Sequence, residues 1–267
     1  MKTLFLTFTL FAATAFATSV GAAENASKVV RLASLHWPPY ASDSLPGQGA
    51  TVSVVRAALA EMGYELQVDF YPWSRTVYLA KDEQSDYAGY FPEYFNAEIS
   101  DTFIYSDAIG SGPLGLVENK NNRISWHSLE DLKGFSIGVV TGYTNTAEFD
   151  QKVAAGELTA FPVVADKHNI RKVAYGRIDL AVIDENLLQY MLSTDADLRS
   201  LRDKVDINSH LLEVKQLYVC FKRSRPELAE ILNEGLRRID VKRRQQSYLS
   251  DIFSAAEAQP SSYSAGK

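Results

Sequence analysis

The chain reads Ser34-Leu-His-Trp-Pro-Pro-Tyr40 directly after an apolar run, Val29–Ala33, and a helical pattern begins near Gln48. Two aromatic residues therefore bracket two prolines where a buried strand leaves its sheet. Proline fixes φ and restricts the residue before it, so Trp37 and Tyr40 lie on a stiff turn. Open α/β sheets bind ligands at the carboxyl ends of their strands, so the turn favours a platform for a small molecule. The alternative is that the turn only packs Trp37 onto its own side of the fold.

The first residues have the pattern of a secretory signal peptide. Lys2 supplies a positive start, the stretch Leu4–Ala17 is almost wholly apolar, and small residues follow up to Ala23. The apolar part is too short to span a bilayer. We expect cleavage after Ala23, so that residues 1–23 are the signal peptide and the mature protein is periplasmic. Because the single cysteine, Cys220, lies far from the cleavage site, we expect no lipid anchor.

Composition and charge exclude several classes of protein. A hydrophobic content of 46% supports a packed core, and a formal net charge of −6 argues against a general nucleic-acid or anionic-membrane partner. A lone cysteine cannot form an internal disulfide. We expect no metal and no cofactor, because neither a phosphate loop nor a nucleophile elbow occurs and the histidines lack metal-ligand spacing. Those histidines are His36, His127, His168 and His210.

Strand and helix patterns alternate along the chain, which predicts an α/β fold with parallel strands. The first series is expected at Lys28–Ser34, Gln48–Met62, Leu66–Phe70, Ser74–Ala80 and Tyr87–Phe91. The second series is expected at Phe135–Val140, a helix from near Tyr143, Thr159–Val164, Lys167–Tyr175, Ile178–Ile183, Glu185–Leu192 and Lys215–Phe221. Helices after Pro226 and up to about Phe253 complete the fold.

The two series predict two lobes joined by two crossing segments, near Gly110–Leu116 and Leu212–Leu217. The first lobe would then be discontinuous, and the second would be inserted into it. The expected bounds are 24–112 with 216–254 for lobe 1, 113–215 for lobe 2, and 255–267 for a flexible tail of small and polar residues.

Four segments in this order resemble solute-binding protein family 3, the exported binding proteins that serve polar amino-acid ABC importers. The segments are Trp37-Pro-Pro-Tyr40, Tyr105-Ser-Asp107, Ser128-Leu-Glu-Asp-Leu-Lys-Gly134 followed by Ile137-Gly-Val139, and Gly176-Arg-Ile-Asp-Leu-Ala-Val-Ile-Asp184. They match the family's aromatic-proline turn, its Phe-Ser-Asp-Pro-Tyr segment, the opening of its second lobe, and its Gly-Arg-X-Asp strand. The resemblance covers nearly all of the mature chain. It implies a two-lobed periplasmic binding protein fold (type II) with a hinged cleft that closes on a ligand.

The resemblance implies capture of a small polar solute, such as an amino acid or a related amine or carboxylate. The solute would be delivered to an ABC permease of the inner membrane by a monomeric, non-enzymatic protein. One alternative is an enzyme on the same fold, such as a prephenate or arogenate dehydratase, with Glu93, His36 or Asp184 as general acid. Another is a ligand-sensing partner of a membrane receptor. Turnover of prephenate separates the enzyme from the binding protein.

Asp184 follows the apolar strand and precedes a helical pattern, so its carboxylate is expected in the crevice. In the family the matching Asp accepts hydrogen bonds from the ligand's α-ammonium group. Asp is also a good N-cap for the helix from Glu185, and the two roles are compatible. The loop Thr141-Gly-Tyr-Thr144, with Tyr143, joins a strand to a helix and is expected to bind an anion at the helix N-terminus. The alternative for Thr144 is ordinary capping.

Further aromatic residues are candidates for the pocket walls. Trp73 opens the helix after the second strand, and it would sandwich a ligand with Trp37 unless it packs in the core. Tyr90 and Phe91 end the third strand and would add aromatic surface. Glu93 would favour an amine-bearing ligand or cap the next turn.

One departure from the family pattern concerns the ligand carboxylate. The family's amino-acid binders carry an Arg seven residues before the serine that corresponds to Ser106, and this chain has Ile99 there. No Arg occurs between Arg75 and Arg123. Arg75 is the expected substitute, because it lies at a helix start on the same crevice, with a solvent-facing helix charge as the alternative.

Overall fold

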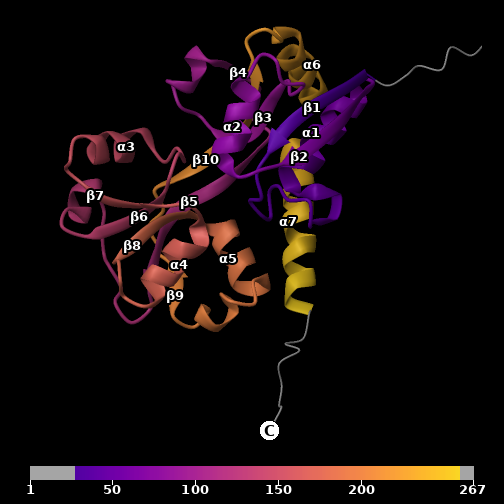
Figure 1. Ribbon diagram of the computed structural model, residues 1–267. Helices are drawn as coiled ribbons and strands as arrows, with labels where there is room; N and C mark the ends of the chain where they lie inside the picture. Colours follow the sequence, from indigo (N-terminus) through magenta and orange to yellow (C-terminus); the bar gives the residue numbers. More distant parts are fainter. Residues whose placement is uncertain (1–27, 259–267) are drawn as a thin grey trace, which may run out of the picture.

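The structure is a computed structural model that describes residues 28–258 (Figure 1). The predicted signal peptide, residues 1–23, lies outside the described residues. The first part of the chain forms β1 (Lys28–Ser34), α1 (Ala50–Glu61), β2 (Tyr64–Phe70), α2 (Trp73–Lys81), β3 (Gly89–Tyr94), β4 (Phe103–Tyr105) and β5 (Gly110–Asn119). The second part forms β6 (Ser136–Val140), α3 (Ala147–Ala154), β7 (Thr159–Val163), α4 (Asp166–Ala174), β8 (Leu180–Asp184), α5 (Glu185–Thr194), β9 (Val205–Ile207), β10 (Glu213–Lys222), α6 (Pro226–Arg237) and α7 (Val241–Ala258). Short 3-10 turns lie at Pro46–Gln48, Ile99–Asp101, Leu129–Leu132 and Arg199–Leu201.

The strands form one twisted sheet in the order β2-β1-β3-β10-β5-β8-β6-β7. The strand β1 is parallel to β2 and β3, and β6 is parallel to β7 and β8, as the sequence predicts. The strands β5 and β10 are antiparallel to their neighbours, so the sheet as a whole is mixed. The prediction of parallel strands is therefore correct within each half and wrong for the strands that join them.

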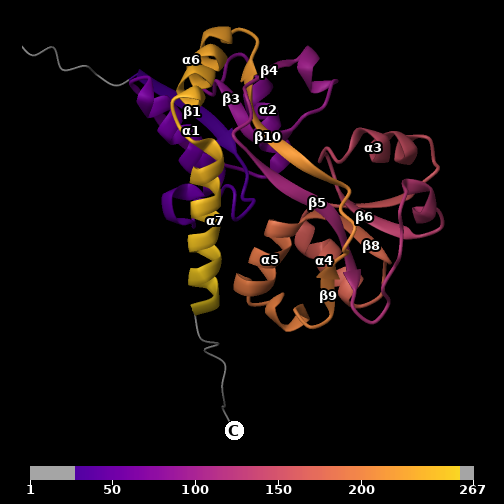
Figure 2. The same ribbon diagram turned by 180° about the vertical axis from the view of Figure 1, so that it is seen from behind.

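The two halves of the sheet belong to two lobes, which Figures 1 and 2 show on either side of β5 and β10. We call the part with β1–β4, α1, α2, α6 and α7 the first lobe, and the part with β6–β9 and α3–α5 the second lobe. The predicted crossing segments are the paired strands β5 and β10, with a register from Gly110 opposite Leu217 to Leu114 opposite Glu213. Both strands run through both lobes, so the predicted residue bounds of the lobes stay a prediction.

The helix α1 shows how the spacing of apolar residues decides which face of a helix is buried. Its apolar positions Val52, Val55 and Leu59 are fully buried, as their three- and four-residue spacing predicts. The helix begins at Ala50 rather than at Gln48, because Gly49 has φ 114° and lies outside the helical region. The helix α1 packs against α6, α7 and β2.

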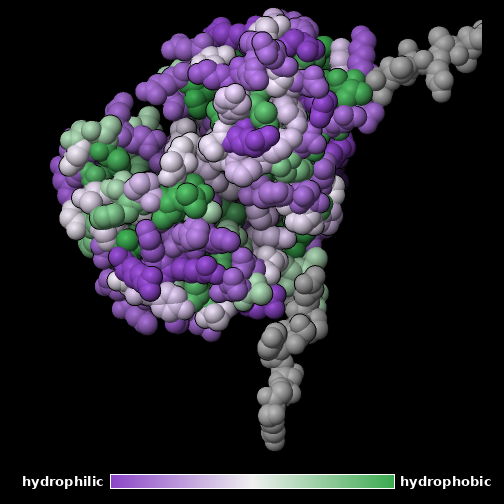
Figure 3. Space-filling view, in the orientation of Figure 1, coloured by the Kyte–Doolittle hydropathy of each residue, from purple (hydrophilic) through white to green (hydrophobic). Residues whose placement is uncertain are grey.

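The long helix α7 lies along the first lobe and also contacts α5 of the second (Figure 2). Its Gln245 makes two hydrogen bonds to the backbone of Ser111 on β5, at 2.7 and 3.0 Å. The helix extends to Ala258, so the prediction of a loose tail from residue 255 is wrong for 255–258. Residues 259–267 lie outside the described residues. The surface in Figure 3 is mostly hydrophilic, with hydrophobic residues scattered over it, and it is indented where the lobes meet.

Candidate functional site

The turn that follows β1 is held against the start of α1. Within the turn, the Trp37 N–H donates to the Ala41 carbonyl at 2.7 Å, and the Ala41 N–H donates to the Trp37 carbonyl at 3.1 Å. The N–H groups of Ala50 and Thr51, which have no partner inside the helix, donate to the carbonyls of Pro39 and Tyr40 at 3.0 Å. These bonds close the turn and hold it to the start of α1.

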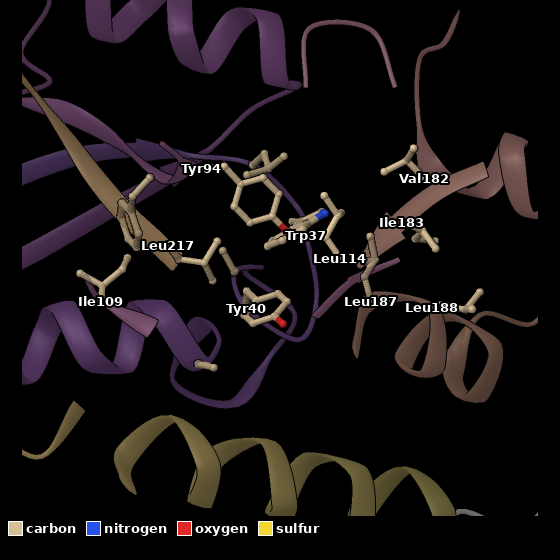
Figure 4. Close-up of a cluster of buried hydrophobic side chains, with 14 of the residues drawn as sticks. Trp37, Tyr40, Tyr94, Ile109, Leu114, Val182, Ile183, Leu187, Leu188 and Leu217 are labelled. Carbon is tan, nitrogen blue, oxygen red and sulfur yellow. The ribbon is translucent and has the colours of Figure 1, made fainter. Parts of the chain in front are cut away.

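The anchored turn aims two stacked rings at the second lobe. The Trp37 and Tyr40 rings stack at 4.6 Å between centroids, and Tyr94 meets Trp37 edge-on at 6.0 Å. Figure 4 shows these three rings on one side of Leu114, and Ile183 and Leu187 of the second lobe on its other side. The prediction that the turn carries aromatic side chains to the carboxyl end of β1 is confirmed.

The hydroxyl of Tyr40 crosses between the lobes to Asp184, the last residue of β8. It lies 3.0 Å from Oδ2 and 3.1 Å from Oδ1 of that carboxylate. The Asn186 side-chain amide donates to the Tyr40 hydroxyl at 2.7 Å, and the Leu187 N–H donates to Asp184 Oδ1 at 3.0 Å. Asp184 is therefore the N-cap of α5, as one of its two predicted roles requires. Its other predicted role is to accept hydrogen bonds from a ligand ammonium group. In this structure the carboxylate accepts from the Tyr40 hydroxyl instead.

Burial dominates the electrostatics of this pair. Asp184 is fully buried, and desolvation raises the pKa of its carboxyl to about 7, against the opposing hydrogen bonds from Leu187 and Tyr40.

The close approach of Tyr40 and Asp184 also requires a glycine at position 112. A Cβ on Gly112 of β5 would lie 2.1 Å from Asp184 Oδ2 and 2.3 Å from the Tyr40 hydroxyl.

A small cavity remains between the lobes beside this pair. Its volume is about 30 Å³, room for one or two water molecules. It is lined by Leu35, Trp37, Trp73, Pro92, Glu93, Tyr94, Tyr143, Thr144 and Leu217. At its edge the Trp73 indole N–H donates to the Gly142 carbonyl of the second lobe at 2.8 Å. The lobes are therefore closed on each other.

Two further buried carboxyls belong to the same region. Glu93 accepts from the Tyr90 hydroxyl at 3.0 Å and from the Tyr94 N–H at 2.9 Å, and burial raises its pKa to about 8. Burial raises the pKa of Asp166, at the start of α4, to about 7, against the opposing effect of the Tyr143 side chain. Glu93 thus meets a tyrosine hydroxyl in the same way as Asp184, and Asp166 lies near the tyrosine at 143.

The predicted site residues divide into three groups by location. Trp37, Trp73, Tyr143 and Thr144 line the cavity, and Tyr40 and Asp184 meet beside it. Tyr90 and Phe91 are buried, with Tyr90 supporting Glu93 and Phe91 inside the hydrophobic core. Thr141 and Arg75 are exposed, and the Arg75 guanidinium lies over the Tyr71 ring at 5.4 Å. Their roles toward a ligand stay predictions.

The helix expected from near Tyr143 begins later, at Ala147. Thr146 is its N-cap and accepts from the Phe149 N–H, so capping by Thr144 is wrong. The N–H groups of Thr141 and Tyr143 donate to the carbonyls of Val163 and Val140, inside the second lobe. The helix therefore begins after residues 141–144, and the anion site predicted for this loop stays a prediction.

Sequence reasoning missed Tyr94, Asp166 and Asn186 as parts of the site. Asp166 reads as a helix start and Asn186 as a surface residue in the first turn of a helix. Tyr94 lies just beyond the third predicted strand, and it continues the two-residue alternation of that strand. Only this alternation gave a signal, because the other two reach the cavity region through the packing of α4 and α5.

Solved structures of similar fold match almost the whole chain. A histidine kinase sensor domain with similarity to periplasmic binding proteins has a TM-score of 0.68 at 14% identity, covering 86% of this chain and 96% of that one. An amino-acid ABC transporter substrate-binding protein from Streptococcus pneumoniae bound to L-arginine has a TM-score of 0.65 at 15% identity, with coverage of 87% and 97%. The chain has the fold of a two-lobed periplasmic binding protein.

A third match is an ancestral amino acid-binding protein described as a precursor of cyclohexadienyl dehydratase, with a TM-score of 0.64, 16% identity and coverage of 84% and 95%. No protein-family model matches the chain, and no curated protein matches it. The likeness to these solved structures therefore shows the two-lobed fold alone.

Two further findings concern the part of the chain that the structure describes. Between residues 28 and 258, no helix combines the length and the apolar character that crossing a membrane requires. In the same range, no three His, Cys, Asp or Glu side chains are grouped as ligands of one metal ion.

Proposed function

We propose that this protein is an exported solute-binding protein that captures a small polar solute between its lobes for delivery to an ABC importer. One observation carries the proposal. Asp184 lies buried at the carboxyl end of β8 and takes a hydrogen bond from the opposite lobe. A carboxylate in that position can exchange the Tyr40 hydroxyl for a ligand ammonium group, and a bond to a charged donor is worth about 1.5–3 kcal/mol.

The surrounding residues support capture by closure. Trp37 and Trp73 come from the first lobe, while Tyr143 and Thr144 come from the second, so a ligand among them would contact both lobes. A ligand that binds the closed form better shifts the population toward it. The periplasmic location and the inner-membrane permease belong to the same proposal, on the strength of the signal-like segment at residues 1–23.

A ligand screen by thermal shift and calorimetry tests the proposal. Amino acids, amines and small carboxylates are added to the mature protein, because a bound ligand raises stability by RT ln(1 + [L]/Kd). We expect saturable binding of at least one solute, and we expect Asp184→Asn to weaken it at least tenfold. The matched control is Asp203→Asn, at an exposed position. Saturable binding that is equally strong in Asp184→Asn contradicts the role of Asp184.

A second candidate function is a dehydratase on the same fold, favoured by one observation. Burial raises the pKa of Glu93 to about 8, so this cavity-lining carboxyl is protonated at neutral pH, as a general acid requires. Incubation with prephenate and arogenate, followed by detection of the aromatic product, tests this alternative. Turnover that is lost in Glu93→Gln would favour the enzyme over the binding protein.

A further inference from the structure

We infer that the ligand of the cleft is a small organic cation with at least two amine groups and no carboxylate, held by Glu93 and Asp166 as well as by Asp184. The inference rests on the proposed function and names the ligand class of that same site. It is carried by the charge of the groups around the cavity, by their spacing, and by two buried polar atoms that have no partner.

The first step is the charge of the site. The side chains of Glu93, Asp166 and Asp184 are 5%, 8% and 1% exposed. No Lys, Arg or His side chain within residues 28–258 forms an ion pair with any of the three. A buried carboxylate without a cationic partner is costly, and that cost raises its pKa. A ligand that brings positive charge removes the cost at each position.

The second step is the spacing of the three carboxyls. Glu93 lies on β3 of the first lobe, whereas Asp166 and Asp184 lie at the start of α4 and the end of β8 in the second. They do not form a group that could share one metal ion. A single ammonium group or metal ion therefore cannot neutralise all of them. A molecule with separated amines can reach both lobes.

The third step is a pair of buried polar atoms on residues that line the cavity. Trp37 Nε1 and the Tyr94 hydroxyl have no hydrogen-bond partner among the described residues, although these side chains are only 7% and 8% exposed. Such atoms are rare in folded proteins, because each carries a desolvation cost. They mark the cavity as a place where a ligand or its water belongs.

Tyr94 links these atoms to the carboxyls. Its hydroxyl has a pKa raised first by burial and then by the negative charges of Asp184 and Asp166, so it lies within their field. The Tyr94 oxygen can accept a hydrogen bond from an ammonium group. The Trp37 N–H can donate to a hydroxyl group or to a water molecule that enters with the ligand.

The fourth step is that no Arg or Lys is among the described residues that line the cavity. Arg75 is exposed and lies over Tyr71, away from the cavity-lining residues. Lys215 is buried near the site, and its charge opposes the rise in the pKa of Glu93 without forming an ion pair with it. It pairs with Glu213 at 3.5 Å and lies over the Tyr94 ring at 5.5 Å. A carboxylate on the ligand would enter a site that is already rich in buried acids, and like charges disfavour that.

Cadaverine and lysine give a matched pair of probes, since lysine is cadaverine with one added carboxylate. Calorimetry on the mature protein should show saturable binding of cadaverine, and at least tenfold weaker binding of lysine and of the single amine butylamine. Glu93→Gln and Asp166→Asn should each weaken cadaverine binding at least tenfold. The controls Glu98→Gln and Asp203→Asn, at exposed positions, should bind like the parent protein.

The outcomes separate this inference from the proposed function. Lysine or a carboxylate that binds as well as cadaverine overturns the ligand class but leaves solute capture intact. Cadaverine affinity that is unchanged in both Glu93→Gln and Asp166→Asn overturns the roles of these two residues. The absence of binding for every amine, amino acid and carboxylate overturns both the inference and the proposed function. The comparison of cadaverine with lysine uses the parent protein alone, so it decides the ligand class even where a variant misfolds.

Discussion

At the scale of single residues, the contact between Tyr40 and Asp184 explains how the lobes are held closed. The tyrosine hydroxyl lies within hydrogen-bond distance of both carboxylate oxygens, and the Asn186 side-chain amide donates to that hydroxyl. A buried acid without this donor would be left with only the backbone N–H groups of α5. The Tyr40 hydroxyl therefore stabilises the buried Asp184 carboxyl while the lobes are closed. A ligand could reach this carboxyl only when the cleft opens.

Tyr40→Phe should destabilise the ligand-free protein by about 1–3 kcal/mol, because it leaves a buried carboxyl and the Asn186 amide without their shared partner. Urea unfolding followed by circular dichroism measures this change. Tyr78→Phe is the matched control, since Tyr78 is 67% exposed and its variant should unfold like the parent. Equal unfolding free energies for Tyr40→Phe and the parent would contradict the importance of this contact.

The raised pKa values predict how stability depends on pH. Burial raises the pKa of Asp184 and Asp166 to about 7 and that of Glu93 to about 8, whereas unfolded carboxyls titrate near 4. Between these values the folded chain binds more protons than the unfolded chain, so its stability falls as pH rises. Each pKa unit corresponds to about 1.4 kcal/mol.

Unfolding free energies at pH 5 and pH 8, measured without added ligand, give this fall in stability. Asp184→Asn removes one of the titrating groups and should make the fall between the two pH values smaller. Asp203→Asn should leave it unchanged, because Asp203 is exposed. A larger fall in Asp184→Asn than in the parent would show that this carboxyl titrates in the opposite sense.

The sequence located Asp184 and Tyr40 but not their contact. Both follow from local rules, since one ends a buried strand and the other lies on a proline turn. They are 144 residues apart, and only the packing of the two lobes decides that they meet. Asp166 was missed for the same reason, because a helix start gives no local sign of the tyrosine that it will face.

At the scale of elements, long and strongly patterned segments were predicted well and short ones were not. The strand Lys28–Ser34 has the predicted bounds, and the apolar spacing of α1 gave its buried face. The strands β4 and β9 have three residues each, too few to show a period. The start of α3 was placed early, because the cap at Thr146 competes with an equally suitable threonine at 144.

The strand β5 is constrained where it passes between the lobes. Gly112→Ala should destabilise the closed form, because the added methyl group would overlap Asp184 Oδ2 and the Tyr40 hydroxyl, and overpacking costs about 1–3 kcal/mol. Urea unfolding measures this cost. Ser111→Ala, at the next position of the same strand, adds no atom and should have a smaller effect. A Gly112→Ala variant as stable as Ser111→Ala would mean that the site yields without strain.

At the scale of the whole molecule, the closed arrangement depends on few contacts outside the two shared strands. Tyr40 contacts Asp184 and Asn186 of the second lobe, and Trp73 contacts the Gly142 carbonyl and the Tyr143 ring. The helix α7 also contacts α5. The pattern of elements along the chain predicted two lobes, but it could not predict that they would be closed. Closure depends on a balance of a few kcal/mol between contacts that local sequence patterns do not report.

The bond from Trp73 to Gly142 gives a test of that balance. A neutral hydrogen bond contributes about 0.5–1.5 kcal/mol, so Trp73→Phe should shift the ligand-free population toward the open form by a few fold. Small-angle scattering should then show a larger radius of gyration. The matched control is Trp126→Phe, because Trp126 donates to Asn208 within the second lobe and its loss affects stability without freeing the lobes. If the two variants scatter alike, the Trp73 indole does not hold the lobes together, and closure rests on Tyr40, Asp184 and α7.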